Sequence, residues 1–167
     1  KYNIIYADPP WHYQTWGEGG NINVTSKYKT MFMQEIWDLP VNKIADDNCV
    51  LFLWVTYPKL LDCIKTIEKW GFEYKTCAFS WIKKNKKSDS LFWGLGYWTR
   101  ANNEICLLAT KGKPKRVSKS VHQVIHEPLR EHSRKPDTAR SRIVELCGDL
   151  PRIELFARQK VEGWDCW

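Results

Sequence analysis

Ile4-Ile5-Tyr6-Ala7-Asp8-Pro9-Pro10-Trp11, near the start of this 167-residue chain, joins four apolar residues to an acid, two prolines and a large aromatic residue. The apolar run predicts a buried β-strand over residues 2–7. Proline fixes its own φ and restricts the residue before it, so we expect Asp8 and Pro9 to be held in extended geometry. The stretch therefore predicts a buried strand that ends in a rigid polar edge.

The rest of the chain alternates between apolar runs and helical patterns. Residues 49–55 are continuously apolar, as expected of a central parallel strand that is covered on both faces. Further strands are expected at residues 74–82, 104–110 and 152–157. Helices are expected at residues 31–38, 58–70 and 136–147. This alternation predicts an α/β fold with a mainly parallel, doubly wound sheet, formed by a single domain over residues 1–167.

The two longer helices are each expected to bury one apolar face against the sheet. In the helix at residues 58–70, that face is formed by Leu60, Leu61, Ile64 and Ile67. In the helix at residues 136–147, it is formed by Ala139, Ile143 and Cys147.

The carboxyl ends of the strands are the expected position of a ligand site, because doubly wound sheets bind ligands there. Asp8 follows one such end, and Lys83 and Arg158 follow two others. Residues 84–103 and 111–135 are long irregular segments, and loops of that length inside a compact domain are usually functional. We therefore expect the site to combine these strand ends with long loops.

The chain is basic, with 26 Lys and Arg against 19 Asp and Glu, a net charge of +7 and a pI of about 9.1. The basic residues cluster at 83–87, 111–119 and 130–142, and several of the ten tryptophans lie beside these clusters. Basic charge mixed with aromatic residues is typical of a surface that contacts phosphates and stacks bases. We expect a nucleic-acid partner; the alternative is that the lysines only solvate the surface and the tryptophans pack the core.

The six cysteines include no CxxC pair and lie mostly in apolar stretches, so we interpret them as small buried hydrophobic residues of a reduced cytosolic protein. No run of about 18 uncharged apolar residues occurs, so no membrane span is expected. The start of the chain has no signal-peptide pattern. We expect a cytoplasmic protein, or a nuclear one in a eukaryote.

The chemistry of the first motif favours methyl transfer to an amino group. The amino nitrogen of a heterocycle such as adenine is a poor nucleophile because its lone pair is delocalised into the ring. The Asp8 carboxylate and the Pro9 carbonyl can accept its two hydrogens and so free the lone pair for in-line attack on a methyl group. Because Pro9 and Pro10 hold these acceptors rigidly, no rearrangement is needed as charge develops. Trp11 is expected to offer a face to the base.

Five blocks of the chain, in order, resemble those of the MT-A70-like adenine methyltransferases. They are 6–11 (YADPPW), 51–56 (LFLWVT), 94–98 (GLGYW), 133–136 (SRKP) and 153–158 (IELFAR). The resemblance covers nearly the whole chain. It implies a Rossmann-like methyltransferase fold with permuted motif order, S-adenosyl-L-methionine as methyl donor, and the 6-amino group of adenine in DNA or RNA as acceptor.

The resemblance also implies roles for individual residues. Asp8, Pro9, Pro10 and Trp11 match the catalytic motif. The residues implied at the cofactor are Asp8, Lys135, Glu154 and Arg158, with Lys135 facing the cofactor carboxylate. The residues expected at the target base are Tyr28, Trp81, Lys83, Trp98 and Ser133. After Arg158 the chain departs from the His-Asn of better-known relatives, and the family uses a polar stretch that would follow Trp167.

Three other site types are not favoured. His122 and His126 have the spacing of one helical face, but the segment is β-branched and lacks the glutamate placement of a metalloprotease helix, so no metal is expected. The HxE and PCxxC motifs of zinc deaminases do not occur. The glycines at 17–20 match neither GxGxxG nor a Walker motif, and we interpret them as a lid beside the catalytic strand.

Two functions stay open at this point. One is an active adenine methyltransferase that acts on a flipped-out or single-stranded base. The other is a catalytically silent nucleic-acid-binding subunit, against which the intact Asp8 motif argues. We expect DNA rather than RNA as substrate, because the short chain carries no attached RNA-binding module and looks like bacterial or phage members. A homodimer or a paired subunit is a further possibility.

Overall fold

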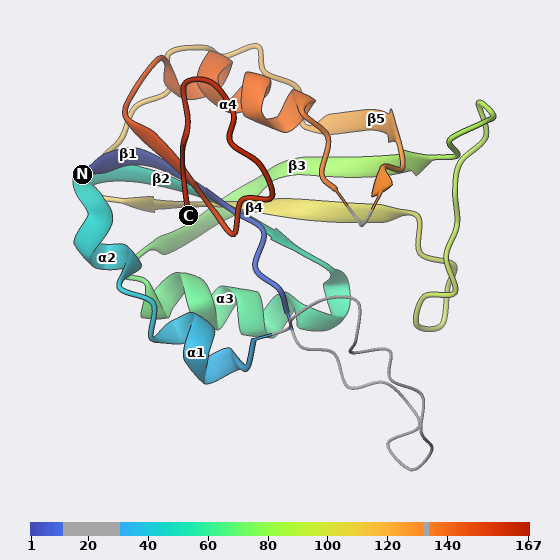
Figure 1. The fold of residues 1–167 in the computed structure, drawn as a ribbon, viewed down its shortest axis with the longest axis horizontal. Helices are drawn as coiled ribbons and strands as arrows, with labels where there is room; N and C mark the ends of the chain where they lie inside the picture. The colour runs from blue at the N-terminus through green and yellow to red at the C-terminus, as the bar shows by residue number, and fades with distance from the viewer. Residues whose placement is uncertain (12–30, 132–133) are drawn as a thin grey trace.

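A computed structural model describes residues 1–11, 31–131 and 134–167 (Figure 1). The strands of the described residues form one sheet in the order β5-β3-β4-β2-β1-β6-β7. The strands are β1 (Tyr2–Ala7), β2 (Ala45–Val55), β3 (Glu73–Lys84), β4 (Asn103–Lys111), β5 (Val124–Pro128), β6 (Arg152–Leu155) and β7 (Asp165–Cys166). The helices are α1 (Met33–Trp37), α2 (Val41–Ile44), η2 (Tyr57–Lys59), α3 (Leu60–Lys69) and α4 (Thr138–Cys147).

The sheet is mainly parallel, which confirms the prediction. β1 pairs in parallel with β2 and β6, β3 with β5, and β6 with β7. β4 is the exception, because it runs antiparallel to both β2 and β3. The chain returns from β3 to β4 without a crossover helix, and a direct return places successive strands antiparallel. β2 is therefore central, as expected, but parallel to its β1 neighbour alone.

Helices cover both faces of the sheet, as in a doubly wound fold: α1, α2 and α3 lie on one face and α4 lies on the other (Figure 1). Each face has its own hydrophobic cluster. In β1, Ile5 and Ala7 belong to the cluster beneath α3, whereas Ile4 and Tyr6 belong to the cluster beneath α4. This alternation explains why the run is continuously apolar: both faces of β1 are buried.

The buried face of α4 is as expected, since Ala139, Ile143 and Cys147 are all buried. The prediction for α3 is wrong at Leu61, whose side chain is 84% exposed. Ile67 is buried, and Leu60 and Ile64 pack against the core. A residue one position after Leu60 is rotated by about 100° around the helix axis, so Leu61 falls outside the stripe that faces the sheet.

Two edge strands were not predicted. β5 buries one hydrophobic side chain, that of Ile125, and β7 is two residues long with both side chains exposed. Short strands at a sheet edge need not be apolar, because one side and one face lie open to water. Hydrophobic patterning therefore gives no signal for either strand.

Four cysteines, Cys49, Cys63, Cys106 and Cys147, are buried, as the sequence predicted, whereas Cys166 is exposed. Burial raises the pKa of Cys49 and Cys63 to about 12. A thiol with so high a pKa carries almost no thiolate at neutral pH and is a poor nucleophile. In the part of the chain that the structure describes, no helix is long and apolar enough to cross a membrane.

Candidate active site

The strand directions bring one edge of the sheet together around Asp8. β1, β2, β3 and β6 run in the same direction, so their carboxyl ends meet at this edge. Because β4 runs the opposite way, its amino end lies at the same edge, and Trp81 of β3 is paired with Glu104 of β4. Glu104, at the start of β4, therefore lies at the same edge of the sheet as the residues that follow the other strands.

A chain of four charged side chains occupies this edge. Lys135, just before α4, lies 3.5 Å from an Asp8 oxygen and 2.8 Å from an oxygen of Glu104. Lys83, near the end of β3, donates a hydrogen bond of 2.7 Å to the other oxygen of Glu104. The Lys135 side chain is only 10% exposed and that of Glu104 only 8%. Two lysines thus flank a buried glutamate, and one of them continues to Asp8.

The charge states of this network follow from burial and from the neighbouring charges. Burial would lower the pKa of Lys135, but the charges of Asp8 and Glu104 outweigh it and raise that pKa. Burial would raise the pKa of Glu104, but Lys135 and Lys83 outweigh it and lower that pKa. For Asp8, burial prevails over the attraction of Lys135 and raises the pKa. The result is a fixed cation and a fixed anion beside a more basic carboxylate.

Buried aromatic residues pack next to the charged network and are hydrogen-bonded to one another. The indole N–H of Trp54 donates a 2.7 Å hydrogen bond to the Tyr6 hydroxyl, and the Trp11 indole N–H donates a 3.0 Å bond to the Trp54 carbonyl. The Lys135 ammonium lies 5.7 Å from the centre of the Trp54 ring. These contacts tie β1, β2 and the segment before α4 together.

Trp11 differs from the expectation that it offers a face to the base. Its side chain is 5% exposed and packs in the core beneath α3, where its indole N–H is already bonded. The Trp11 N–H donates to the Pro9 carbonyl at 2.9 Å, so the chain turns tightly after Pro9. A carbonyl oxygen can accept two hydrogen bonds, so this turn is compatible with Pro9 as an acceptor for substrate.

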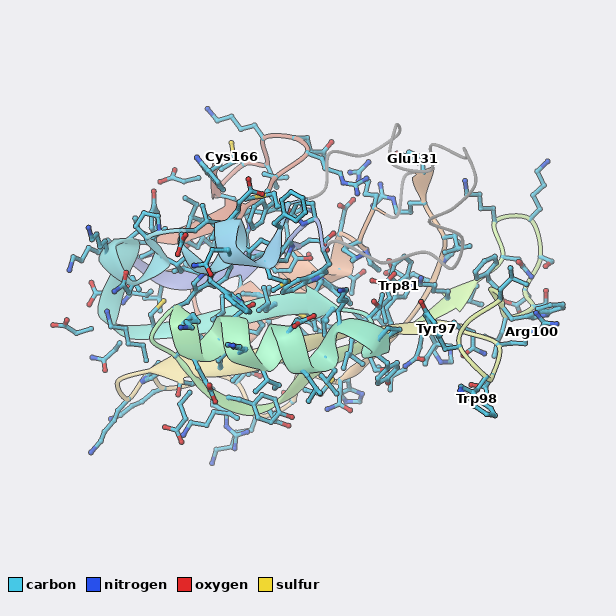
Figure 2. All side chains as sticks on the ribbon, turned by 90° about the horizontal axis from the view of Figure 1, so that it is seen from below. Trp81, Tyr97, Trp98, Arg100, Glu131 and Cys166 are labelled. Carbon is cyan, nitrogen blue, oxygen red and sulfur yellow. The ribbon has the colours of Figure 1, made fainter. Side chains whose placement is uncertain are left out.

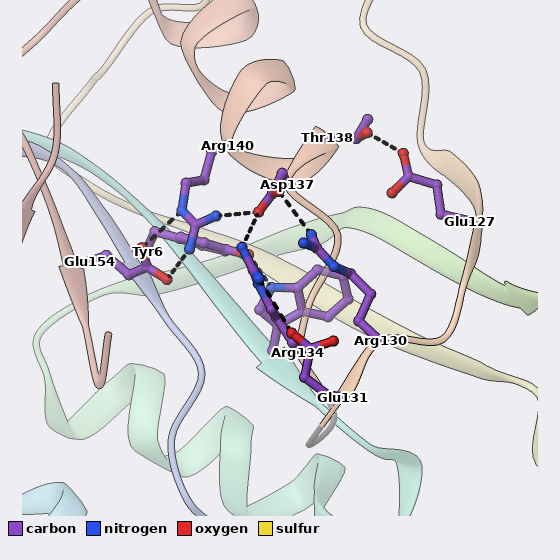
Figure 3. A network of polar contacts seen from close by, with 10 residues as sticks. Tyr6, Glu127, Arg130, Glu131, Arg134, Asp137, Thr138, Arg140 and Glu154 are labelled. Carbon is purple, nitrogen blue, oxygen red and sulfur yellow. Dashed lines mark hydrogen bonds and ion pairs between the residues drawn. The ribbon is translucent and has the colours of Figure 1, made fainter. Parts of the chain in front are cut away.

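The residues expected at the cofactor lie in two different surroundings. Lys135 contacts Asp8, and the charge of Arg158 lowers the pKa of Asp8, so both cations lie around this carboxylate. Glu154 instead receives two hydrogen bonds from Arg140, at 2.9 and 2.8 Å (Figure 3). Arg140 also lies over the Tyr6 ring and bonds Asp137. Glu154 as a cofactor ligand stays a prediction, and its carboxylate is already held by an arginine.

Of the residues expected at the target base, the structure describes three: Lys83 lies 5.3 Å from the centre of the Trp81 ring, whereas Trp98 is separate from both. Trp81 is fully buried, with its indole N–H donating to the Glu127 carbonyl at 2.9 Å. Trp98 is fully exposed on the loop between β3 and β4, well away from Trp81 (Figure 2). Lys83 belongs to the charged network. Tyr28 and Ser133 lie outside the described residues, as does the lid expected at residues 17–20.

Glu104 is the main site residue that the sequence reasoning missed. It is the single acid in the run from Glu104 to Ala109 and stands at its first position. A charge at the start of an otherwise buried strand is a signal that could have been used. Glu104 lies at the catalytic edge only because β4 is antiparallel to its neighbours, however, and the alternation of strands and helices predicts parallel strands.

A mainly parallel, doubly wound sheet with this charged edge after its first strand is the arrangement of a Rossmann-like methyltransferase. The chain matches the MT-A70 family over residues 2–167, and it belongs to this family. The type II methyltransferase M.MunI of a Mycoplasma species is 36% identical over 185 residues, covering 100% of this chain and 76% of the relative.

Eukaryotic relatives match over the same domain. An N(6)-adenosine-methyltransferase MT-A70-like protein of Drosophila melanogaster is 32% identical over 163 residues, covering 95% of this chain and 24% of the relative. The human N(6)-adenosine-methyltransferase catalytic subunit METTL3 is 30% identical over 160 residues, covering 95% of this chain and 26% of that protein. The chain therefore spans about a quarter of the length of these two eukaryotic relatives.

Proposed function

We propose that this protein transfers a methyl group from S-adenosyl-L-methionine to the 6-amino group of adenine in DNA. The observation that carries the proposal is the Asp8 carboxylate, which ends β1 at the carboxyl edge of the sheet and is contacted by the buried Lys135. Family membership adds that MT-A70 methyltransferases use this donor. The position, the rigid Pro9-Pro10 segment and the charge of Asp8 suit an acceptor for amino hydrogens.

The charged groups around Asp8 fit the amino-acid part of S-adenosyl-L-methionine. That part carries a carboxylate and an ammonium group; Lys135 contacts the carboxylate of Asp8, and the charge of Arg158 acts on the same carboxylate. Lys135 and Arg158 would hold the carboxylate, and Asp8 would face the ammonium. When bound, the donor supplies an electrophilic methyl group.

The Asp8 side chain and the Pro9 backbone then act on the amino group of the base. Asp8 and the Pro9 carbonyl accept its hydrogens and direct its lone pair for attack. As the new N–C bond forms, positive charge develops on the nitrogen and the Asp8 carboxylate stabilises it. The raised pKa of Asp8 strengthens it as a hydrogen-bond acceptor and as a base for the proton that the nitrogen releases. Glu104 keeps Lys135 in place, which positions Asp8 indirectly.

DNA is favoured over RNA by the pattern of relatives. The relative named as a type II methyltransferase matches the whole chain, and the chain covers 76% of it. The relatives named as adenosine methyltransferases match at lower identity and over about a quarter of their length. RNA is the second candidate, because a site that recognises adenine accepts the base from either polymer unless the sugar 2′ position is contacted.

The test is transfer of labelled methyl from S-adenosyl-L-methionine to matched DNA and RNA oligonucleotides, single- and double-stranded, followed by nucleoside analysis. We expect labelled 6-methyladenine in DNA, at a higher rate than in RNA of the same sequence. A higher rate on RNA would assign the second candidate. Absence of labelled product on every substrate, with binding to DNA retained, would indicate a catalytically silent binding subunit, alone or paired with a second chain.

The activity is expected to fall at acidic pH, because Asp8 accepts hydrogen bonds from the substrate only when it is ionised. Burial raises the Asp8 pKa above its ordinary value of 3.8, so the acid limb of kcat/KM should have its midpoint above pH 3.8. Lys135→Met removes a charge that lowers this pKa and should move the midpoint to higher pH. Glu104→Gln removes a charge that raises it and should move the midpoint to lower pH.

Profiles of kcat/KM against pH for the three proteins check this prediction. Opposite displacements are expected because Lys135 and Glu104 carry opposite charges near the same carboxyl group. Two displacements in the same direction, or none, would show that a group other than Asp8 sets the acid limb.

A further inference from the structure

Residues 85–102, which join β3 to β4, form an ordered projection that we call the finger. It begins at the catalytic edge, where the Phe92 N–H donates to the Lys83 carbonyl and the Lys83 N–H donates to the Asn102 carbonyl, both at 2.9 Å. Farther out, the Gly94 N–H donates to the Ala101 carbonyl at 2.6 Å. Backbone hydrogen bonds thus hold the finger in a defined shape that extends beyond the end of the sheet (Figure 1).

Several large apolar side chains of the finger leave 44% or more of their surface exposed. Five of the exposed large hydrophobic residues of the described chain lie within eight consecutive positions: Leu91, Trp93, Leu95, Tyr97 and Trp98. Figure 2 shows Trp98 and Arg100 away from the buried Trp81, whereas Tyr97 lies nearer to it in this view. An exposed cluster of this kind contributes nothing to the core, and such clusters mark interaction sites.

The backbone of the finger presents Trp98 outward at a conformational cost. Trp98 has φ +69°, which is uncommon for a bulky residue. Two residues earlier, Gly96 has φ +61°, and a Cβ there would lie 2.1 Å from the Thr99 carbonyl oxygen. A strained residue whose side chain packs against nothing in its own domain is expected where the side chain serves another purpose.

The charge of the finger identifies its partner as nucleic acid. Lys84, Lys86, Lys87 and Arg100 stand on or at the base of the finger against the single acid Asp89. The Arg100 guanidinium lies 5.3 Å from the centre of the Trp93 ring. Exposed aromatic faces that follow three lysines and precede Arg100 along the chain suit stacked bases and their phosphates.

We propose that the finger is a base-stacking element that holds nucleotides flanking the target adenine, with Trp98 and Trp93 stacking unpaired bases. This assignment rests on the proposed nucleic-acid substrate and moves Trp98 from the target-base pocket to a second contact outside it. The finger begins next to Lys83, whose side chain donates to Glu104 in the charged network of Asp8, so the finger leaves the sheet at the catalytic edge.

The first test measures binding without methylation. Fluorescence anisotropy with a labelled oligothymidine, which has no adenine, reports contacts outside the target-base site. Trp98→Ala is expected to weaken binding about tenfold, because stacking is lost, and Trp98→Phe to restore it to within about twofold of wild type. Leu61→Ala removes another largely exposed apolar side chain, on α3, and should leave binding unchanged. Lys87→Ala should weaken binding and reduce its salt dependence, whereas Lys43→Ala, which removes an exposed lysine of α2 outside the three basic clusters, should leave both unchanged.

The second test separates this proposal from the catalytic one. Trp98→Ala should raise KM for DNA and leave kcat unchanged, whereas a variant of Asp8 should lose methylation and keep oligothymidine binding. Wild-type affinity in Trp98→Ala, or no oligothymidine binding by the wild type, would overturn the proposal. A third outcome would also overturn it: sedimentation shows that wild type is a dimer and that Trp98→Ala is a monomer, while both bind oligothymidine equally well. The finger would then be a protein interface.

Discussion

Asp8→Ala is expected to lower kcat for methyl transfer by at least about 10²–10³-fold, which is the usual effect of removing one preorganised group that stabilises charge in the transition state. The variant loses the carboxylate that accepts an amino hydrogen and faces the nitrogen as it becomes positive. Asp8→Asn should retain part of the activity lost in Asp8→Ala, because its amide oxygen can still accept one hydrogen bond but carries no charge. Single-turnover rates with saturating S-adenosyl-L-methionine and DNA check both variants.

The loss must come from the site and not from unfolding. Asp62→Asn is the control for Asp8→Asn, because it makes the same substitution on α3. The Asp62 carboxylate forms a partly exposed ion pair with Lys59, so the methyl-transfer rate of this variant should equal that of wild type. Calorimetry should show that Asp8→Ala still binds S-adenosyl-L-methionine, more weakly, because Lys135 and Arg158 stay in place. Wild-type rates in Asp8→Ala would refute the proposed mechanism.

Glu104→Ala is expected to lower the free energy of unfolding by about 3–5 kcal/mol, the usual effect of removing one partner from a buried ion pair. Glu104 lies between Lys83 and Lys135. Its removal takes an ion-pair partner from both lysines, and Asp8 stays in contact with Lys135. Urea unfolding followed by tryptophan fluorescence measures the change. Glu73→Ala is the matched control, since its ion pair with Lys75 is exposed and its loss should change stability by no more than about 0.5 kcal/mol.

The effect of Glu104→Ala should also depend on pH. The lysines lower the pKa of Glu104 below its ordinary value of 4.5, so its contribution to stability is present above pH 4.5 and is lost as the pH falls through the folded-state pKa. The difference between variant and wild type should therefore be largest near neutral pH and shrink in acid. A difference that stays constant down to the acid transition would mean that packing, not charge, explains the loss.

Much of the fold could be predicted because the evidence for it is local. The continuous apolar runs of β1 and β2 indicated strands buried on both faces, and the spacing of Ala139, Ile143 and Cys147 gave the buried face of α4. Leu61 shows the limit of this reasoning, because periodicity defines a stripe only to within about one residue position. β5 and β7 show another limit, since edge strands lack an apolar signature.

The site was predictable in part. The charge and the prolines of the Asp8 segment indicated an acceptor on their own, and Lys135 and Arg158 followed from the family resemblance. The surroundings of the tryptophans were not predictable. Trp11 and Trp81 are buried, with their indole N–H groups bonded to backbone carbonyls, whereas Trp98 is fully exposed. A tryptophan has the same apolar ring in all three places, and only the path of the surrounding backbone decides whether a neighbour covers it.

The sequence by itself determined that a buried strand ends in a rigid acidic edge at Asp8, because proline geometry and apolar burial act over neighbouring residues. Only the tertiary structure decided what surrounds that acid. The antiparallel direction of β4 brings Glu104 to the carboxyl ends of the other strands, and the segment before α4 places Lys135 between Glu104 and Asp8. Charges interact through space, so the pKa of Asp8 depends on residues that are distant along the chain.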